Sequence, residues 1–288
     1  MRDMLVAVLL VAALGCGENV TPASSYPPGE RNPPPGHDPY QAIPAGALAC
    51  TPNLDEQIDS TELSVALGAS AWYLVSPAGA QRNVNLSGSS ESGQQTWDWG
   101  TDLAEDQLAQ LSPHALSGRW YAAHFPKGQF AVAFDAAGTL ESVSSQDEEG
   151  LWLHGLASTE SDPPEGRTLL VYDSPILVLR YPVVKGSAWS WTGRVRNGVL
   201  RGFPWAQIDR YDVKVDAVGR LILPDLDFSQ VFRVRTTVTA TPVMGAPVVQ
   251  RQTSFMAECF GEIARATSEV GEARDEFTVA SEVRRLGL

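Results

Sequence analysis

Strict alternation of apolar and polar residues is the feature that most constrains the fold of this chain. In residues 189–196, Trp189, Trp191 and Val195 fall on one side of an extended backbone and polar residues fall on the other. The same period of two recurs in three further segments: 129–134, 211–217 and 232–238. A period of two predicts strands with one buried and one solvated face, which is typical of antiparallel sheets.

Glycine-containing stretches between or beside these segments carry turn chemistry. They occur at residues 126–128, 136–138, 196–198 and 218–219, and each predicts a hairpin turn. Residues 277–286 resemble a last strand. We therefore expect a mainly β fold: a single curved antiparallel sheet or open half-barrel, built from a meander of hairpins, over residues 50–288.

One or two short helices are expected beside this sheet, the clearest of them over residues 102–111. Thr101 is a candidate N-cap and acidic residues follow in the first turns. Apolar residues recur at i, i+4 and i+7: Ala104, Leu108 and Leu111. This spacing predicts one apolar helix side facing the sheet.

The N-terminus predicts export. Residues 5–14 are all apolar, a run too short for the roughly 20 residues that span a bilayer but suited to the core of a signal peptide. The run ends in Ala13-Leu14-Gly15-Cys16, which resembles the lipobox of bacterial lipoproteins, although Ala13 stands where Leu or Val is more usual. The alternative is an ordinary secretory peptide in which Cys16 is incidental.

The lipobox resemblance implies cleavage after residue 15 and a Cys16 thiol that carries a diacylglycerol anchor. Residues 1–15 are then the signal peptide, and the membrane is reached through the lipid on Cys16. Gly17 follows in place of the aspartate that favours inner-membrane retention in this family, so the resemblance implies an outer-membrane lipoprotein.

Residues 16–49 are expected to tether the folded domain. The stretch 26–36 is rich in proline and lacks apolar periodicity, which predicts an extended, partly polyproline-II spacer. The alternative is a proline-rich recognition ligand. The formal net charge of −13 argues against nucleic acid as a partner and against electrostatic attachment to anionic lipid; protein partners are not indicated.

Two cysteines remain after Cys16, namely Cys50 and Cys259. Their separation excludes a CxxC redox motif and zinc-knuckle spacing. Since an exported chain can form disulfides, a structural bridge between them is expected. The alternative is a pair of buried free thiols.

Motifs for catalysis or metal binding are missing from the sequence, so no catalytic residue, metal or cofactor is expected. It contains no GxSxG, SxxK or HExxH pattern. His124 and His154 fall in expected strands and form the one conceivable metal or acid–base pair, against the alternative of two ordinary half-buried histidines. The acidic stretches 146–149, 160–165 and 225–227 lack EF-hand spacing and are expected to be solvated loops.

Tryptophan is the most distinctive residue type, with eight in the chain. Trp189 and Trp191 lie on the apolar face of their strand and are expected in the core. Trp97 and Trp99 lie beside the expected helix and are candidates for the rim of a site for an apolar or glycan ligand.

The C-terminal half, about residues 150–288, resembles a family of uncharacterised secreted bacterial β-proteins. Residues 181–190 (YPVVKGSAWS) are similar to their YPL-x-x-G-x-x-W stretch, and residues 219–228 to their V-x-V-P-A-G-x-F stretch, with Asp225-Leu226 in place of small residues. Residues 257–263 are similar to a further strand but lack its leading Trp. These motifs are structural, and at fold level the family shares a curved sheet with lipoprotein-carrier half-barrels.

These observations favour a non-enzymatic β-domain of the bacterial envelope that binds a ligand or acts as a scaffold. The alternative function is a hydrolase acting on envelope polymer or glycan. Its paired carboxylates would come from distant strands and leave no local motif.

Overall fold

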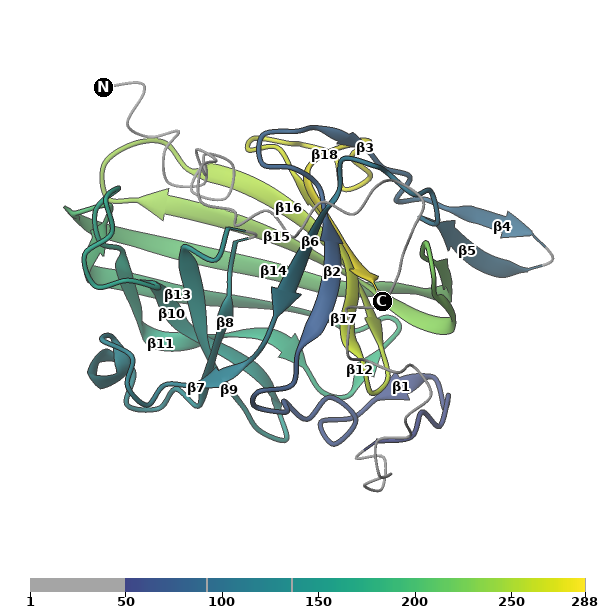
Figure 1. Cartoon of the computed structure of the whole chain (residues 1–288), viewed down its shortest axis with the longest axis horizontal. Coiled ribbons are helices and arrows are strands. Elements are labelled where there is room, and N and C mark those ends of the chain that lie inside the picture. The colour runs from purple at the N-terminus through teal and green to yellow at the C-terminus, as the bar shows by residue number, and fades with distance from the viewer. Residues whose placement is uncertain (1–49, 92, 136, 288) are drawn as a thin grey trace, which may run out of the picture.

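The computed structural model describes residues 50–91, 93–135 and 137–287. The expected signal peptide, Cys16 and the spacer lie outside the described residues. The described part is mainly β, as predicted (Figure 1). Its elements are β1 (Gln57–Ile58), β2 (Ala71–Val75), β3 (Arg82–Asn83), β4 (Ser89–Glu91), β5 (Gln94–Asp98), β6 (Gln107–Leu111), β7 (His114–Ala115), the 3₁₀ helix η3 (Ala122–His124), β8 (Phe130–Ala133), β9 (Leu140–Gln146), β10 (Gly150–Ser158), β11 (Leu169–Arg180), β12 (Val183–Val184), β13 (Ala188–Leu200), β14 (Phe203–Ile222), β15 (Asp227–Pro242), β16 (Val248–Ala257), β17 (Gly261–Ser268) and β18 (Val279–Gly287).

One large sheet contains nearly all of these strands. From β7 to β18, each strand pairs with the next along the chain, except that β12 pairs with β1 in a separate ladder. The N-terminal strands β2 and β6 extend the sheet beyond β18. The expected antiparallel meander is confirmed.

The sheet curls until its two ends approach each other. β6 and β7 lie at opposite ends of the strand order, yet only Ser112 and Pro113 separate them in the chain. Across the curl, Arg284 on β18 donates a hydrogen bond to the backbone carbonyl of Phe134, just beyond β8, at 2.8 Å. Among the described strands, no ladder joins β6 to β7, so the sheet is curved and open, not closed into a barrel (Figure 1).

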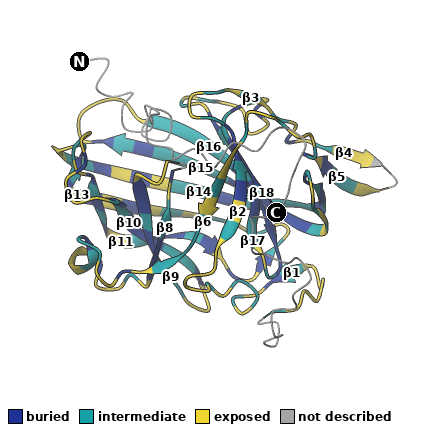
Figure 2. Ribbon diagram, viewed as in Figure 1, coloured by how far each residue is buried: buried dark blue, intermediate teal, exposed yellow. Residues whose placement is uncertain are grey.

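Burial along the strands follows the period of two (Figure 2). On β13, Gly193 and Val195 are buried toward the inside of the curl, whereas Ser190, Thr192 and Arg194 are exposed on the outer face. β14 continues both faces in register.

Part of the outer face is covered by the segment containing β3, β4 and β5. β5 pairs in parallel with β14 and crosses over Gly219, where a Cβ would stand 2.3 Å from the carbonyl oxygen of Gln95. The turn predicted at residues 218–219 is therefore wrong: this glycine is inside β14 because another backbone crosses it.

The turn predicted at residues 196–198 is also wrong, because β13 continues through it with a register shift. A Cβ on Gly198 would lie 2.6 Å from Cγ1 of Val195, so this glycine too permits close packing within a strand. The chain reverses instead at residues 201–202 and 223–226.

The helix predicted over residues 102–111 is not formed. Gln107–Leu111 is strand β6 and pairs with β2 along all five residues. Pairing with the sheet edge overrides the weak helical spacing. Asp106, one of the acidic residues expected in the first turns of this helix, has its side chain buried in an ion pair with Arg285.

Cys50 and Cys259 are bonded, as predicted, with their Cα atoms 5.5 Å apart. The bridge ties the first described residue to the turn between β16 and β17. Beside it, Ile58 and Val183 of the β1–β12 ladder pack with Phe232 in a core cluster.

Candidate functional site

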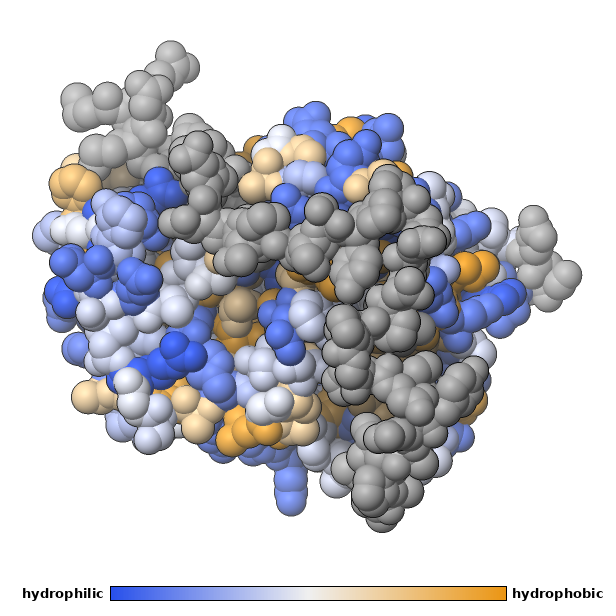
Figure 3. All heavy atoms as spheres, in the orientation of Figure 1, coloured by the Kyte–Doolittle hydropathy of each residue, from blue (hydrophilic) through white to orange (hydrophobic). Residues whose placement is uncertain are grey.

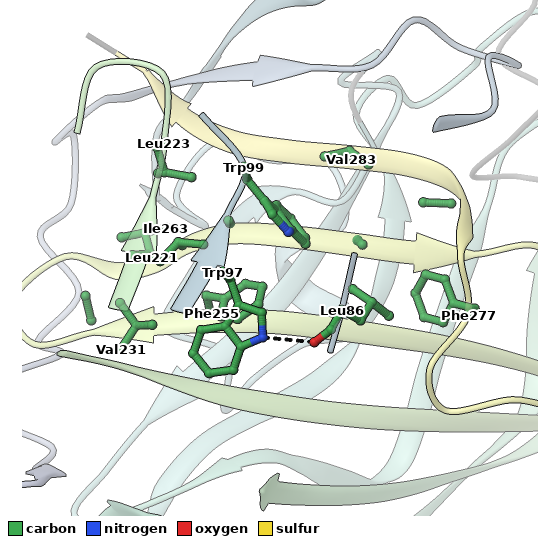
Figure 4. Packing of buried hydrophobic residues seen from close by; sticks show 14 residues of the cluster. Leu86, Trp97, Trp99, Leu221, Leu223, Val231, Phe255, Ile263, Phe277 and Val283 are labelled. Carbon is green, nitrogen blue, oxygen red and sulfur yellow. Dashed lines mark hydrogen bonds between the residues drawn. The ribbon is translucent and has the colours of Figure 1, made fainter. Parts of the chain in front are cut away.

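Trp97 and Trp99, the expected ligand rim, are buried in the largest core cluster (Figure 4). Trp97 is 0% exposed and Trp99 is 7% exposed. Their rings pack on Phe255 with centroids 4.9 and 5.1 Å away, and the indole N–H of Trp97 donates to the carbonyl of Leu86 at 2.9 Å. The expectation of exposed rings is wrong, because β5 lies flat on the outer face and turns both rings toward it.

Trp189 and Trp191, the expected core pair, are only half-buried. Each ring donates its N–H to a backbone carbonyl of β11, that of Leu177 at 3.0 Å and that of Pro175 at 2.9 Å. Trp191 also meets the ring of Trp152 edge to face at 5.3 Å. These rings pack against core clusters but also border the solvent-accessible inside of the curl.

A hollow of about 430 Å³ lies beside Trp99, and we call it the Trp99 hollow. Its lining comes from β3, the segment that follows β5, and β18. The lining residues are Arg82, Asn83, Val84, Asn85, Asp98, Trp99, Thr101, Leu103, Thr278, Val283 and Arg285.

The wall of the Trp99 hollow is fixed by a buried ion pair. Arg285 donates to the carbonyls of Trp99 and Thr101 at 2.7 and 2.6 Å, and to Oδ2 of Asp106 at 2.6 Å. Arg82 adds a contact of 3.0 Å to Oδ1 of Asp106. The side chains of Arg285 and Asp106 are 3% and 2% exposed, so this wall is built on a buried ion pair.

The Trp99 hollow combines a polar rim with an apolar floor. Asn83, Asn85, Thr101 and Thr278 are exposed and supply amide and hydroxyl groups. The floor is made by the apolar members of the lining: Val84, Leu103, Val283 and Trp99. Two arginines, Arg82 and Arg285, also line the hollow. Their positive charges are balanced by the nearby carboxylates of Asp98, Glu105 and Asp106, so the hollow carries no strong charge of either sign.

A second hollow, of about 410 Å³, lies near the β9–β10 turn. Its lining includes Ser64, Leu67, Gln129, Asp147 and Glu148. Hydrogen bonding from the indole of Trp152 lowers the pKa of Asp147. Asp147 and Glu148 make the second hollow acidic.

His124 and His154 have separate roles. His154 lies in β10, as predicted, and its Nε2 is 2.8 Å from the hydroxyl of Ser145; burial lowers its pKa. His124 is exposed in η3 against Trp120, so its predicted strand position is wrong. Among the described residues, no three His, Cys, Asp or Glu side chains gather as metal ligands.

Sequence reasoning missed a buried carboxylate at Glu141 on β9. Its oxygens meet His114 Nε2 at 3.1 Å, Arg119 at 3.4 Å and the hydroxyl of Tyr121. Burial, followed by the hydrogen bond to Glu141, raises the pKa of Tyr121. The cluster links β7 and residues 119–121 to β9. No local motif marks it because its members lie on different segments.

A second buried carboxylate, Asp209 on β14, lies inside the curl. Its Oδ2 accepts hydrogen bonds from the hydroxyl of Tyr172 and the amide of Gln207, both at 2.6 Å. Trp205 donates in turn to Gln207. Burial raises the pKa of Asp209, and these two hydrogen bonds oppose the rise.

No family model matches the chain, and searches of curated proteins and of solved structures found no similar protein. Within the described ranges, no helix is long and apolar enough to cross a membrane.

Proposed function

We propose that this protein is a non-enzymatic ligand-binding domain of the bacterial envelope, attached to the outer membrane through Cys16, and that the Trp99 hollow takes a neutral, hydroxyl-rich ligand such as a short glycan. The observation that carries the proposal is the Trp99 hollow itself. Its volume of about 430 Å³ falls in the usual range for small-ligand sites, and the Arg285–Asp106 pair holds its wall in place.

The lining favours a glycan over an apolar ligand. Exposed amides and hydroxyls on Asn83, Asn85, Thr101 and Thr278 can exchange hydrogen bonds with sugar hydroxyls, because amides and hydroxyls both donate and accept. The small apolar floor suits the C–H faces of a sugar ring. The near balance of charge gives no preference for an anionic or cationic ligand.

The buried carboxylates support a binding role over the alternative of a hydrolase. Asp106, Glu141 and Asp209 all accept hydrogen bonds or ion pairs from side chains of the protein itself. A glycosidase acid or nucleophile must face its substrate, and none of these three carboxylates lines the Trp99 hollow.

Isothermal titration calorimetry with soluble, uncharged chito-oligosaccharides tests the proposal. We expect binding by the wild type, and at least tenfold weaker binding after Asn83→Ala with Thr278→Ala. The matched control is Ser64→Ala with Gln129→Ala in the second hollow, which should bind as the wild type does. The proposal would be contradicted if none of these sugars bound, or if both double variants weakened binding equally. Release of shorter oligosaccharides would favour the hydrolase.

The lipid anchor is tested separately by metabolic labelling with an alkynyl palmitate. We expect label on the wild type and none on Cys16→Ser, together with a shift of the protein from membranes to the soluble fraction. A labelled Cys16→Ser chain would contradict the anchor at this residue.

A further inference from the structure

Two neighbouring hairpins form an uncharged tip at one end of the sheet. We define the apolar tip as residues 202–204, at the β13–β14 turn, and residues 243–247, at the β15–β16 turn. All eight residues are exposed, and none has a polar side chain: Gly202, Phe203, Pro204, Val243, Met244, Gly245, Ala246 and Pro247. Figure 1 shows both hairpins at the left-hand end of the sheet, where apolar atoms reach the surface in Figure 3.

The large apolar side chains of the tip are the most exposed of their kind in the described part of the protein. Phe203 is 66% exposed, Val243 is 77% exposed and Met244 is 80% exposed. The two hairpins are held together, because the N–H of Val243 donates to the carbonyl of Ala206 at 3.1 Å. The exposed groups therefore form one feature instead of isolated surface residues.

Charge is excluded from this region in an otherwise acidic chain. Residues 202–208 and 236–250 contain no charged residue, although the whole chain carries a formal net charge of −13. An anionic or cationic partner would find no complementary group on the tip. The chemistry instead fits the uncharged, apolar interior of a lipid layer.

The size and shape of the tip also favour lipid over protein. Its three large side chains offer only a few hundred Å² of apolar surface, on the scale of the patches of ordinary monomers. A standard protein interface needs about 800 Å² from each partner. A projecting tip of this size can instead insert shallowly into a deformable surface, as the apolar side of an interfacial helix does.

We infer that the apolar tip contacts a lipid surface by inserting Phe203, Val243 and Met244 between lipid headgroups. This contact is distinct from the anchor at Cys16 and does not depend on a ligand in the Trp99 hollow. It orients the domain, since the tip and the Cys50–Cys259 bridge lie at opposite ends of β16. The bridged end, where the expected spacer enters, would then face away from that lipid surface.

Vesicle flotation tests the inference with the chain from residue 16 onward carrying Cys16→Ser, so that neither the apolar run 5–14 nor an acyl chain contributes. The vesicles contain phosphatidylcholine and phosphatidylethanolamine. We expect the protein to float with them, and the partition coefficient to fall at least tenfold after Phe203→Ser with Met244→Ser. Adding phosphatidylglycerol should not strengthen binding, because the tip has no positive charge.

The control is Leu67→Ser, which removes a leucine that is 55% exposed in the second hollow. The partition coefficient of this variant should equal that of the Cys16→Ser protein with an unaltered tip. All variants should keep their melting temperature, since every altered side chain is exposed. Failure of the protein to float, or equal loss in the control, would overturn the inference. So would self-association in light scattering that the tip variant abolishes, because the tip would then be an interface between copies of the chain.

Discussion

Arg285 and Asp106, which lie 179 positions apart in the chain, form a buried ion pair at 2.6 Å behind the Trp99 hollow. The same guanidinium donates to the carbonyls of Trp99 and Thr101. The pair thus joins the last strand, β18, to the segment between β5 and β6, which would otherwise be a loop held mainly by its ends.

Asp106→Asn should destabilise the protein strongly. Breaking a buried pair leaves an uncompensated charge on Arg285, and the typical loss is about 3–5 kcal/mol in the free energy of unfolding. Urea denaturation measures the change. Asp212→Asn is the matched control, because it breaks an ion pair with Arg210 at the surface, and exposed pairs contribute about 0–1 kcal/mol. Equal losses in the two variants would show that burial of the Asp106 pair has no energetic consequence.

Trp97→Ala should cost far more stability than Trp189→Ala. Trp97 is completely buried against Phe255, so its truncation leaves a cavity and should lower the free energy of unfolding by about 3–5 kcal/mol. Trp189 is half-buried, so solvent replaces part of its ring and the loss should be smaller. Thermal unfolding of the two variants gives the comparison. A larger loss for Trp189→Ala would contradict the placement of β5 on the outer face.

Removal of the Cys50–Cys259 bridge should lower stability through the unfolded state. The bridge closes a loop across 209 positions, and its loss in Cys50→Ser with Cys259→Ser should cost roughly 2–5 kcal/mol in a denaturation experiment. Thiol labelling of the denatured, unreduced wild type supplies an independent check. Stoichiometric labelling of both cysteines would show that they are not bonded.

The strands and the disulfide could be predicted from the sequence because both leave a direct signal there. Alternation along residues 189–196 marks β13 whatever its neighbours are. Setting Cys16 aside as the expected lipidation site leaves Cys50 and Cys259 as one possible pair. Gly198 and Gly219 show where such reading fails. A glycine in the sequence suggests a turn at each position. Close packing requires Gly198 inside β13, and the crossing strand β5 requires Gly219 inside β14.

The candidate site was only partly predictable because it, too, depends on contacts between segments that lie far apart in the chain. Trp99 lines the Trp99 hollow, but its burial depends on β5 pairing in parallel with a strand more than a hundred residues later. The clusters around the buried carboxylates of Glu141 and Asp209 likewise bring together side chains from distant segments. A single sequence records the composition of such clusters but not which of their members meet.

Asp209→Asn should change the pH dependence of stability. Burial raises the pKa of Asp209 above its ordinary value, so the folded state holds the proton more tightly than the unfolded state does. The stability contributed by the protonated group is full below the unfolded pKa and is lost as pH rises through the folded pKa. Asn is uncharged at every pH and keeps an oxygen that can accept from Tyr172.

The variant should therefore gain stability relative to the wild type as pH rises from about 3, below the ordinary aspartate pKa of about 3.9, to 7. Urea denaturation across this range measures the difference between the two proteins. Asp227→Asn is the opposite control: its hydrogen bonds with Arg220 lower the pKa of Asp227, so that variant should lose relative stability as pH rises. If the Asp209→Asn difference is flat, or falls with pH, the buried carboxyl does not titrate as its surroundings require.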